Sequence, residues 1–226
     1  MRRILFIGNS LTYYNDLPAL FGDLANDAGF ETITASVTKG GWYLSRFADP
    51  QDEMGAALRR KYPLRWWNDI VLQDQSLNPA IDPDGFLAAV RALRQAMPEG
   101  RFVFYQTFAY EAGSDRLAAT GMTQQEMYDR LRDAYATAAR EHGGLLVPVG
   151  EAFRRIQREH PLVNLYQPDS LHPNLAGSYL AACVFYAALS GRDPQALAAP
   201  KGIDEAKARL IRAAASQTMQ KQDVGE

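Results

Sequence analysis

Three side chains of this sequence, Ser10, Asp169 and His172, are of the types needed for nucleophilic acyl transfer. A serine hydroxyl is a poor nucleophile until a base takes its proton, and a histidine is a good base when a carboxylate fixes its tautomer. Asp169 and His172 are three residues apart in a segment that enters a helix through Pro173, and this proline presets the first helical turn. One rigid segment can therefore supply both the base and its orienting carboxylate.

Ser10 follows a short apolar segment, Ile4–Ile7, that is typical of a buried first strand. Gly8-Asn9-Ser10 stands where this strand must turn. Ligands bind at the carboxyl ends of strands in an open α/β sheet, so a serine delivered there is a candidate nucleophile. Each motif also has a plainer interpretation, with Ser10 as a turn or helix-capping serine and Asp169 as a turn cap beside a surface His172.

The remaining sequence predicts strands that alternate with helices, which implies βαβ units and a parallel sheet covered on both faces. The predicted strands are residues 4–7, 31–37, 69–72, 101–105 and 143–148. The predicted helices are residues 17–28, 50–61, 82–97, 123–142, 150–159, 174–189 and 204–216. Residues 107–120 fit no regular element and are expected to form a loop near the mouth of a site.

Polar or glycine-rich segments follow the first three strands and precede the last long helix. They are the Ser10 turn, Gly40-Gly41, the amide-rich segment 73–78 and the Asp169–His172 pair. In a parallel sheet all four are expected at the same edge. Their combination favours a catalytic site over four unrelated turns.

At residues 3–190 the sequence resembles the SGNH (GDSL-type) hydrolases, a family of esterases, lipases, deacetylases and thioesterases. The family's first block is matched by Gly8–Thr12, with Asn9 where aspartate is more usual, and its last block by Asp169–Pro173. The resemblance implies a three-layer α/β/α sandwich around a five-stranded, flavodoxin-like parallel sheet. It also implies that Ser10, His172 and Asp169 are nucleophile, base and orienting carboxylate.

The resemblance further implies an oxyanion hole built from the Ser10 backbone N–H, a glycine and an asparagine. The glycine corresponds to Gly40 or Gly41, and Asn78 stands where the family's asparagine is expected. The surrounding block departs from the family pattern Gly-x-Asn-Asp, because Ser76 and Pro79 replace the glycine and the aspartate. Gln73 and Gln75 are alternative amide donors, and the block indicates a divergent subfamily.

Four further residues are expected to contact substrate: Asn9, Tyr13, Trp42 and Gln75. Tyr13 follows the serine turn closely, and Trp42 stands beside Gly41, where an indole could form an apolar wall. Trp66 and Trp67 are expected in the core.

The predicted activity is hydrolysis of a small-molecule carboxylic ester, such as an acetyl group on a sugar, through an acyl-enzyme on Ser10. No cofactor and no metal are expected. The alternatives are a non-hydrolytic flavodoxin-like protein that holds a phosphate at Gly8–Ser10 and a catalytically silent fold that binds carbohydrate.

Composition sets the broad class. The sequence is 47% hydrophobic and 22% charged, and its formal net charge of -2 gives no reason to expect nucleic acid or an anionic membrane as partner. Cys183, the sole cysteine, is expected in the core, and the protein is expected to be cytoplasmic. Residues 1–200 are expected to form one domain, followed by a helix and polar tail over 201–226 whose last twenty residues the core does not need. The oligomeric state is left open.

Overall fold

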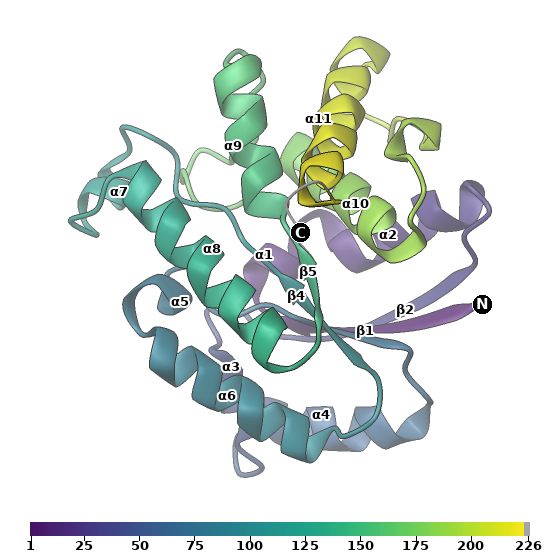
Figure 1. The fold of residues 1–226 in the computed structure, drawn as a ribbon, viewed down its shortest axis with the longest axis vertical. Helices are drawn as coiled ribbons and strands as arrows, with labels where there is room; N and C mark the ends of the chain where they lie inside the picture. Colours follow the sequence, from purple (N-terminus) through teal and green to yellow (C-terminus); the bar gives the residue numbers. More distant parts are fainter. Residues whose placement is uncertain (224–226) are drawn as a thin grey trace.

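The computed structural model describes residues 1–223, with side chains described as far as residue 220. Its central sheet has five strands, β1 (Arg2–Gly8), β2 (Thr32–Thr38), β3 (Asp69–Leu72), β4 (Arg101–Tyr105) and β5 (Leu145–Val147). Their order is β2-β1-β3-β4-β5, and every neighbouring pair is parallel (Figure 1). This order is the flavodoxin-like one, so the predicted fold class is confirmed.

Helices cover both faces of the sheet, because the strands are apolar on both sides. Ile4 and Phe6 of β1 face one layer of core, and Leu5 and Ile7 face the other. The first layer is closed by α2 (Leu17–Asp27), α9 (Val149–Glu159) and α10 (Leu175–Ser190), and the second by α3 (Leu44–Ala48), α4 (Glu53–Lys61), α6 (Pro83–Ala96) and α8 (Gln124–Glu141). No helix in the described chain combines the length and apolar character needed to cross a membrane.

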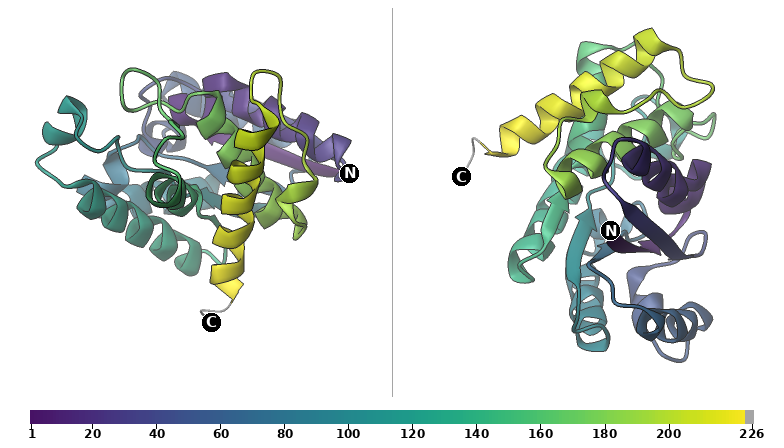
Figure 2. Two further views of the ribbon diagram at one scale, coloured as in Figure 1. Left: turned by 90° about the horizontal axis from the view of Figure 1, so that it is seen from above. Right: turned by 90° about the vertical axis from the view of Figure 1, so that its right-hand side faces the viewer.

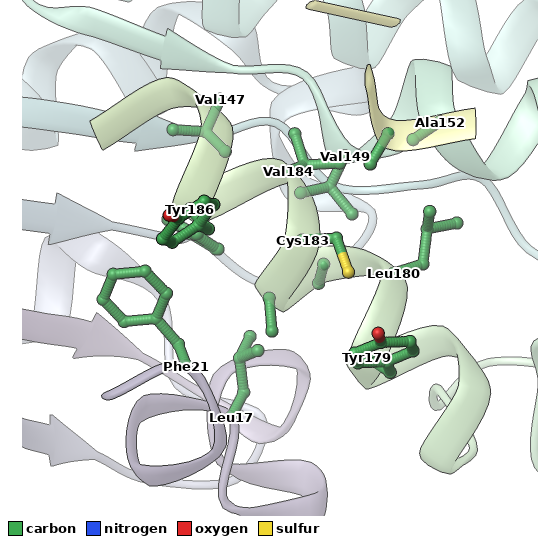
Figure 3. Packing of buried hydrophobic residues seen from close by; sticks show 14 of the residues in the cluster. Leu17, Phe21, Val147, Val149, Ala152, Tyr179, Leu180, Cys183, Val184 and Tyr186 are labelled. Atoms are coloured by element: carbon green, nitrogen blue, oxygen red, sulfur yellow. The ribbon is translucent and has the colours of Figure 1, made fainter. Parts of the chain in front are cut away.

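Helix α10 is buried on almost every side, which explains why its sequence is apolar without a polar stripe. It packs between α2, α9 and a further helix, α11 (Glu205–Asp223). Figure 3 shows its Tyr179, Cys183 and Tyr186 packed among side chains of neighbouring elements. Cys183 is fully buried, as predicted.

The carboxyl-terminal helix differs from the prediction. Helix α11 continues to Asp223 and crosses α10 and α9 (Figure 2), although the sequence pattern placed its end near Ser216. Ala208, Ile211 and Ala215 are buried in the first core layer. These contacts argue against the expectation that the core does not need the last twenty residues. The predicted polar tail after Ser216 is helical as far as Asp223, and residues 224–226 lie outside the described part of the chain.

Short helices account for the other differences. The structure adds α1 (Ser10–Tyr13), α3 (Leu44–Ala48), α5 (Asn78–Ile81) and α7 (Asp115–Ala118), the last within the segment predicted to be irregular. Such single turns are too short to show a hydrophobic period. Trp67 is buried as expected, but Trp66 is 59% exposed and does not belong to the core.

Candidate active site

Ser10 begins α1 directly after β1, at the point where the strand order reverses between β1 and β3. The Asn9 side chain caps this turn by accepting the Leu11 N–H at 3.3 Å. The buried Gln73, which follows β3, accepts the Asn9 N–H at 2.9 Å and the Thr12 hydroxyl at 2.8 Å. These hydrogen bonds therefore fix the turn that presents Ser10 to the end of the neighbouring strand, β3.

Gly8 is required by the lack of space under this turn. A Cβ atom at Gly8 would lie 2.4 Å from Thr12 Oγ1 and 2.6 Å from Gln73 Oε1. We expect Gly8→Ala to lower the free energy of unfolding by about 1–3 kcal/mol, because these buried hydrogen-bonded atoms must move apart. Chemical denaturation of both proteins measures this difference, and an unchanged unfolding midpoint and slope would contradict the tight packing.

The structure brings Ser10, His172 and Asp169 into one hydrogen-bonded chain. His172 Nε2 lies 2.8 Å from Ser10 Oγ, and His172 Nδ1 lies 2.5 Å from Asp169 Oδ2. The other carboxylate oxygen, Oδ1, accepts the backbone N–H groups of His172 at 2.9 Å and Leu171 at 3.1 Å. The carboxylate therefore fixes both the ring and the backbone of the histidine.

The Asp169 carboxylate favours its charged form. Partial burial would raise its pKa, but hydrogen bonds from the His172 ring and from the backbone of His172 and Leu171 outweigh this effect and lower the pKa. Because the folded pKa lies below the unfolded one, this group stabilises the fold above the unfolded pKa. That stabilisation is lost as the pH falls through the folded pKa.

The loop that carries Asp169 is anchored to the 107–120 segment. Ser170 has a left-handed backbone (φ 57°), and its hydroxyl donates to Glu111 Oε2 at 2.7 Å. The Glu111 N–H donates to the Ser170 carbonyl at 3.0 Å, and Arg116 Nε donates to the Asp169 carbonyl at 3.3 Å. The 107–120 segment therefore lies beside Asp169, where the sequence placed the mouth of a site.

Tyr14 and Asn15 hold the other side of His172. The Tyr14 ring stacks on the His172 ring with centroids 4.1 Å apart and planes 7° apart. Asn15, in a left-handed conformation (φ 53°), donates to the Pro173 carbonyl at 3.1 Å and to Ser178 Oγ at 2.8 Å. These contacts join residues that are far apart in the sequence, so no local sequence pattern indicates them.

Gly40 and Gly41 follow β2 at the same edge of the sheet, and Tyr13 lies over the first of them. A Cβ atom at Gly40 would be 2.9 Å from the Tyr13 hydroxyl, whereas Gly41 has open space but a left-handed backbone (φ 71°). Tyr13 in turn stacks beside Tyr14 with centroids 5.8 Å apart. Tyr13 is 41% exposed, and its contact with substrate stays a prediction.

Hydrogen bonds distinguish the candidate amide donors in the segment after β3. Gln73 is fully buried and donates both amide hydrogens, to Asn9 Oδ1 and to the Asp74 carbonyl, so it has none left for a substrate. Gln75 Oε1 accepts the backbone N–H groups of Leu77 and Asn78, so this side chain caps α5. Asn78 Nδ2 donates one hydrogen to Asp74 Oδ2 at 2.7 Å and keeps a second.

Two of the residues expected to touch substrate have internal contacts instead. Asn9 is 2% exposed and donates from Nδ2 to the Trp42 carbonyl at 3.0 Å, so its side chain joins the two loops. The Trp42 indole donates to Asp52 at 3.0 Å, and Lys39 and Arg46 lie over its ring, 3.8 and 3.6 Å from the centroid. These contacts fix the orientation of the ring, and its role in lining the pocket stays a prediction.

A groove of about 830 Å³ opens next to Asp169. It runs between the end of the β3 loop at Leu77, the 110–120 segment and residues 168–170. Its walls combine apolar surface from Leu77 and Pro168 with the polar side chains of Ser114, Asp115 and Arg116. This volume lies within the usual range for small-molecule sites. Among the described residues, no three His, Cys, Asp or Glu side chains gather as metal ligands would.

Comparison with solved structures decides the family. A protein from Slackia heliotrinireducens that is assigned as an SGNH hydrolase shares 31% sequence identity with this chain, with a TM-score of 0.74. The match covers 83% of this chain and 98% of that protein. This chain belongs to the SGNH hydrolases.

More distant structures share the SGNH fold. A DUF4886 family protein from Bacteroides uniformis matches with 22% identity and a TM-score of 0.84, covering 98% of this chain and 96% of its own. A mutant of Axe2, an acetyl-xylooligosaccharide esterase from Geobacillus stearmophilus, matches with 16% identity and a TM-score of 0.59, covering 83% and 94%. No family model and no curated protein matches the chain.

Proposed function

We propose that this SGNH hydrolase is a serine esterase that cleaves carboxylic esters through an acyl-enzyme on Ser10. The observation that carries the proposal is the continuous chain from Ser10 Oγ through His172 to Asp169, with links of 2.8 and 2.5 Å. These distances suit a base that takes the proton of a nucleophile. A turn serine or surface histidine has no need of such a chain.

In the proposed reaction, Ser10 Oγ attacks the ester carbonyl carbon while His172 Nε2 takes the hydroxyl proton. The resulting tetrahedral intermediate collapses as His172 returns that proton to the leaving alcohol, which leaves the acyl group on Ser10. A water molecule then attacks the acyl-enzyme, with His172 again as base, and the acid is released. Asp169 holds the Nδ1–H tautomer and stabilises the imidazolium in both steps.

We propose that three donors stabilise the negative charge on the carbonyl oxygen. They are the Ser10 backbone N–H, the backbone N–H of Gly40 or Gly41, and the Asn78 side chain. Within the described chain, these backbone N–H groups make no hydrogen bond to other backbone groups. Asn78 is a better candidate than Gln73, because Gln73 uses both amide hydrogens, whereas Asn78 Nδ2 makes one hydrogen bond, to Asp74, within the described chain. Gln75 also makes one amide donation, to Ser76 Oγ, but its Oε1 is held by the backbone N–H groups at the start of α5. One such donor is typically worth about 3 kcal/mol in the transition state.

The groove beside Asp169 is proposed to receive the alcohol part of the ester, with a carbohydrate as the favoured alcohol. Ser114, Asp115 and Arg116 offer donors and acceptors that hydroxyl groups can use, next to apolar surface from Leu77 and Pro168. The shared fold with an acetyl-xylooligosaccharide esterase supports the same choice.

Hydrolysis assays test the proposal. The purified protein is expected to release p-nitrophenol from p-nitrophenyl acetate and acetate from acetylated xylo-oligosaccharides. Asp115→Asn is expected to raise KM for the oligosaccharide while leaving p-nitrophenyl acetate turnover unaffected, because Asp115 lines the groove and is not among the residues that hold Asp169. Absence of turnover on every ester would contradict the proposed function, and equal effects of Asp115→Asn on both substrates would contradict the role of the groove.

Tyr14 is expected to contribute to turnover through its stacking on His172. Stacked aromatic pairs are worth about 0.5–1.5 kcal/mol beyond their buried area, so Tyr14→Leu is expected to lower kcat by up to about tenfold. Tyr14→Phe keeps the stacked ring and serves as the control. Steady-state kinetics of the three proteins measure the effect, and a leucine variant as fast as the phenylalanine variant would show that stacking is irrelevant to the base.

A further inference from the structure

Asp74 is a buried carboxylate at the carboxyl edge of the sheet for which the proposed reaction has no direct use. Its side chain is fully buried just after β3. Oδ1 accepts the backbone N–H groups of Leu44 and Gln75, each at 2.7 Å, and Oδ2 accepts Asn78 Nδ2 at 2.7 Å. All three contacts use the carboxylate as an acceptor.

Among the described residues, the influences on the Asp74 carboxylate include no cation. Burial raises the pKa of Asp74, and the opposing influences come from Asn78 and from the backbone of Leu44 and Gln75, all of them neutral donors. The negative charge of Asp82 raises the pKa of Asp74 further. Burying an unpaired carboxylate costs stability, so such a group is a candidate for a functional role.

The partners of Asp74 belong to the two segments that supply the oxyanion donors. Leu44 opens α3, three residues after Gly41, and its N–H is one of the helix-end groups that need an outside acceptor. Asn78 opens α5 on the other side of Asp74. One carboxylate therefore joins the loop after β2 to the loop after β3.

We propose that Asp74 is a positioning residue that sets the Asn78 amide and the Gly40–Gly41 loop in place to receive the oxyanion. A carboxylate only accepts hydrogen bonds, so Asn78 must turn its nitrogen toward Asp74, and the second hydrogen on that nitrogen stays available. An amide at position 74 can donate as well as accept and no longer dictates this orientation. The inference rests on the proposed esterase function.

A double-mutant cycle in the full-length protein tests this role. Asp74→Asn keeps shape and removes charge, and it is expected to lower kcat on p-nitrophenyl acetate about 10²-fold with KM changed less than about threefold, the range for loss of one oxyanion donor. Asn78→Ala is expected to show a similar loss. The double variant is expected to lose clearly less than the product of the two single losses, since Asp74 acts in part through Asn78 and only its effect on the Gly40–Gly41 loop adds to that of Asn78→Ala.

Asp69→Asn is the matched control, because Asp69 is equally buried but opens β3 and binds Arg2 and Arg101 at the opposite end of the sheet. It is expected to lower Tm while its effect on kcat multiplies with that of Asn78→Ala. Losses that multiply for Asp74 and Asn78, or an Asp74→Asn enzyme within threefold of wild type, overturn the positioning role. A wild-type protein without Ser10-dependent turnover would instead refute the proposed function.

Asn78→Asp covers the case in which Asp74→Asn does not fold. It places two carboxyl groups against each other, so it is expected to have a lower Tm than Asn78→Ala at neutral pH and to regain stability on acidification. Equal melting temperatures of the two Asn78 variants at both pH values would overturn the contact and the inference with it.

Discussion

Ser10→Ala is expected to lower kcat for ester hydrolysis by about 10⁶-fold, the loss typical of removing the nucleophile from a serine hydrolase. The alanine leaves His172 and the oxyanion donors in place but offers no oxygen to attack the ester. KM is expected to change little, because the hydroxyl contributes mainly to the transition state. Stopped or continuous assays with p-nitrophenyl acetate measure the effect.

Ser190→Ala is the control for this loss. Ser190 donates its hydroxyl to the Tyr186 carbonyl at the far end of α10 and takes no part in the site. Its variant is expected to keep wild-type turnover. A Ser10→Ala enzyme that retains more than a small fraction of wild-type kcat would place the nucleophile elsewhere.

Asp169→Asn is expected to lower kcat by about 10⁴-fold, because an amide facing His172 Nδ1 favours the wrong imidazole tautomer. The 2.5 Å contact to Nδ1 and the two backbone donors on Oδ1 indicate that the substituted side chain stays in place. The substitution is therefore expected to change the tautomer of His172 and not the conformation of the loop. Circular dichroism is expected to show an unaltered fold.

Asp133→Asn, on the exposed face of α8, is the matched control and is expected to keep full activity. Steady-state kinetics of Asp169→Asn and Asp133→Asn across the neutral pH range measure the two effects. An Asp169→Asn enzyme within tenfold of wild type would show that the carboxylate does not orient the base.

The fold was predictable because its signals are local and repeated. Apolar strands such as Ile4–Ile7 and helix boundaries such as the Thr123–Glu126 capping box depend on neighbouring residues, and both are present in the structure. The end of α11 was misplaced because its continuation to Asp223 depends on packing against α9 and α10. Sequence propensity alone does not report such distant contacts.

The site residues, too, were predictable where their signals are local and not where they depend on distant contacts. Ser10, Asp169 and His172 belong to two short motifs, so their residue types and spacing were sufficient to bring them together as candidates. The sequence does not indicate that Lys39 and Arg46 lie over the Trp42 ring, because the folded loop brings these cations there.

The contacts around His172 and around the proposed oxyanion site could not be predicted from the sequence. Tyr14 stacks on a histidine far along the chain, and Asp74 joins two loops that are distant in sequence. Such residues carry no motif, because their role arises only when separate strand ends meet at one edge of the sheet.

Covalent labelling of Ser10 tests the central claim most directly. The wild-type protein is incubated with a fluorophosphonate, and its intact mass and peptide map are compared with those of Ser10→Ala and His172→Ala. One phosphonyl group per chain on Ser10, absent from Ser10→Ala and formed far more slowly in His172→Ala, is the expected result. An unlabelled wild-type protein, or equal labelling of Ser10→Ala, would contradict a serine nucleophile activated by His172 and Asp169.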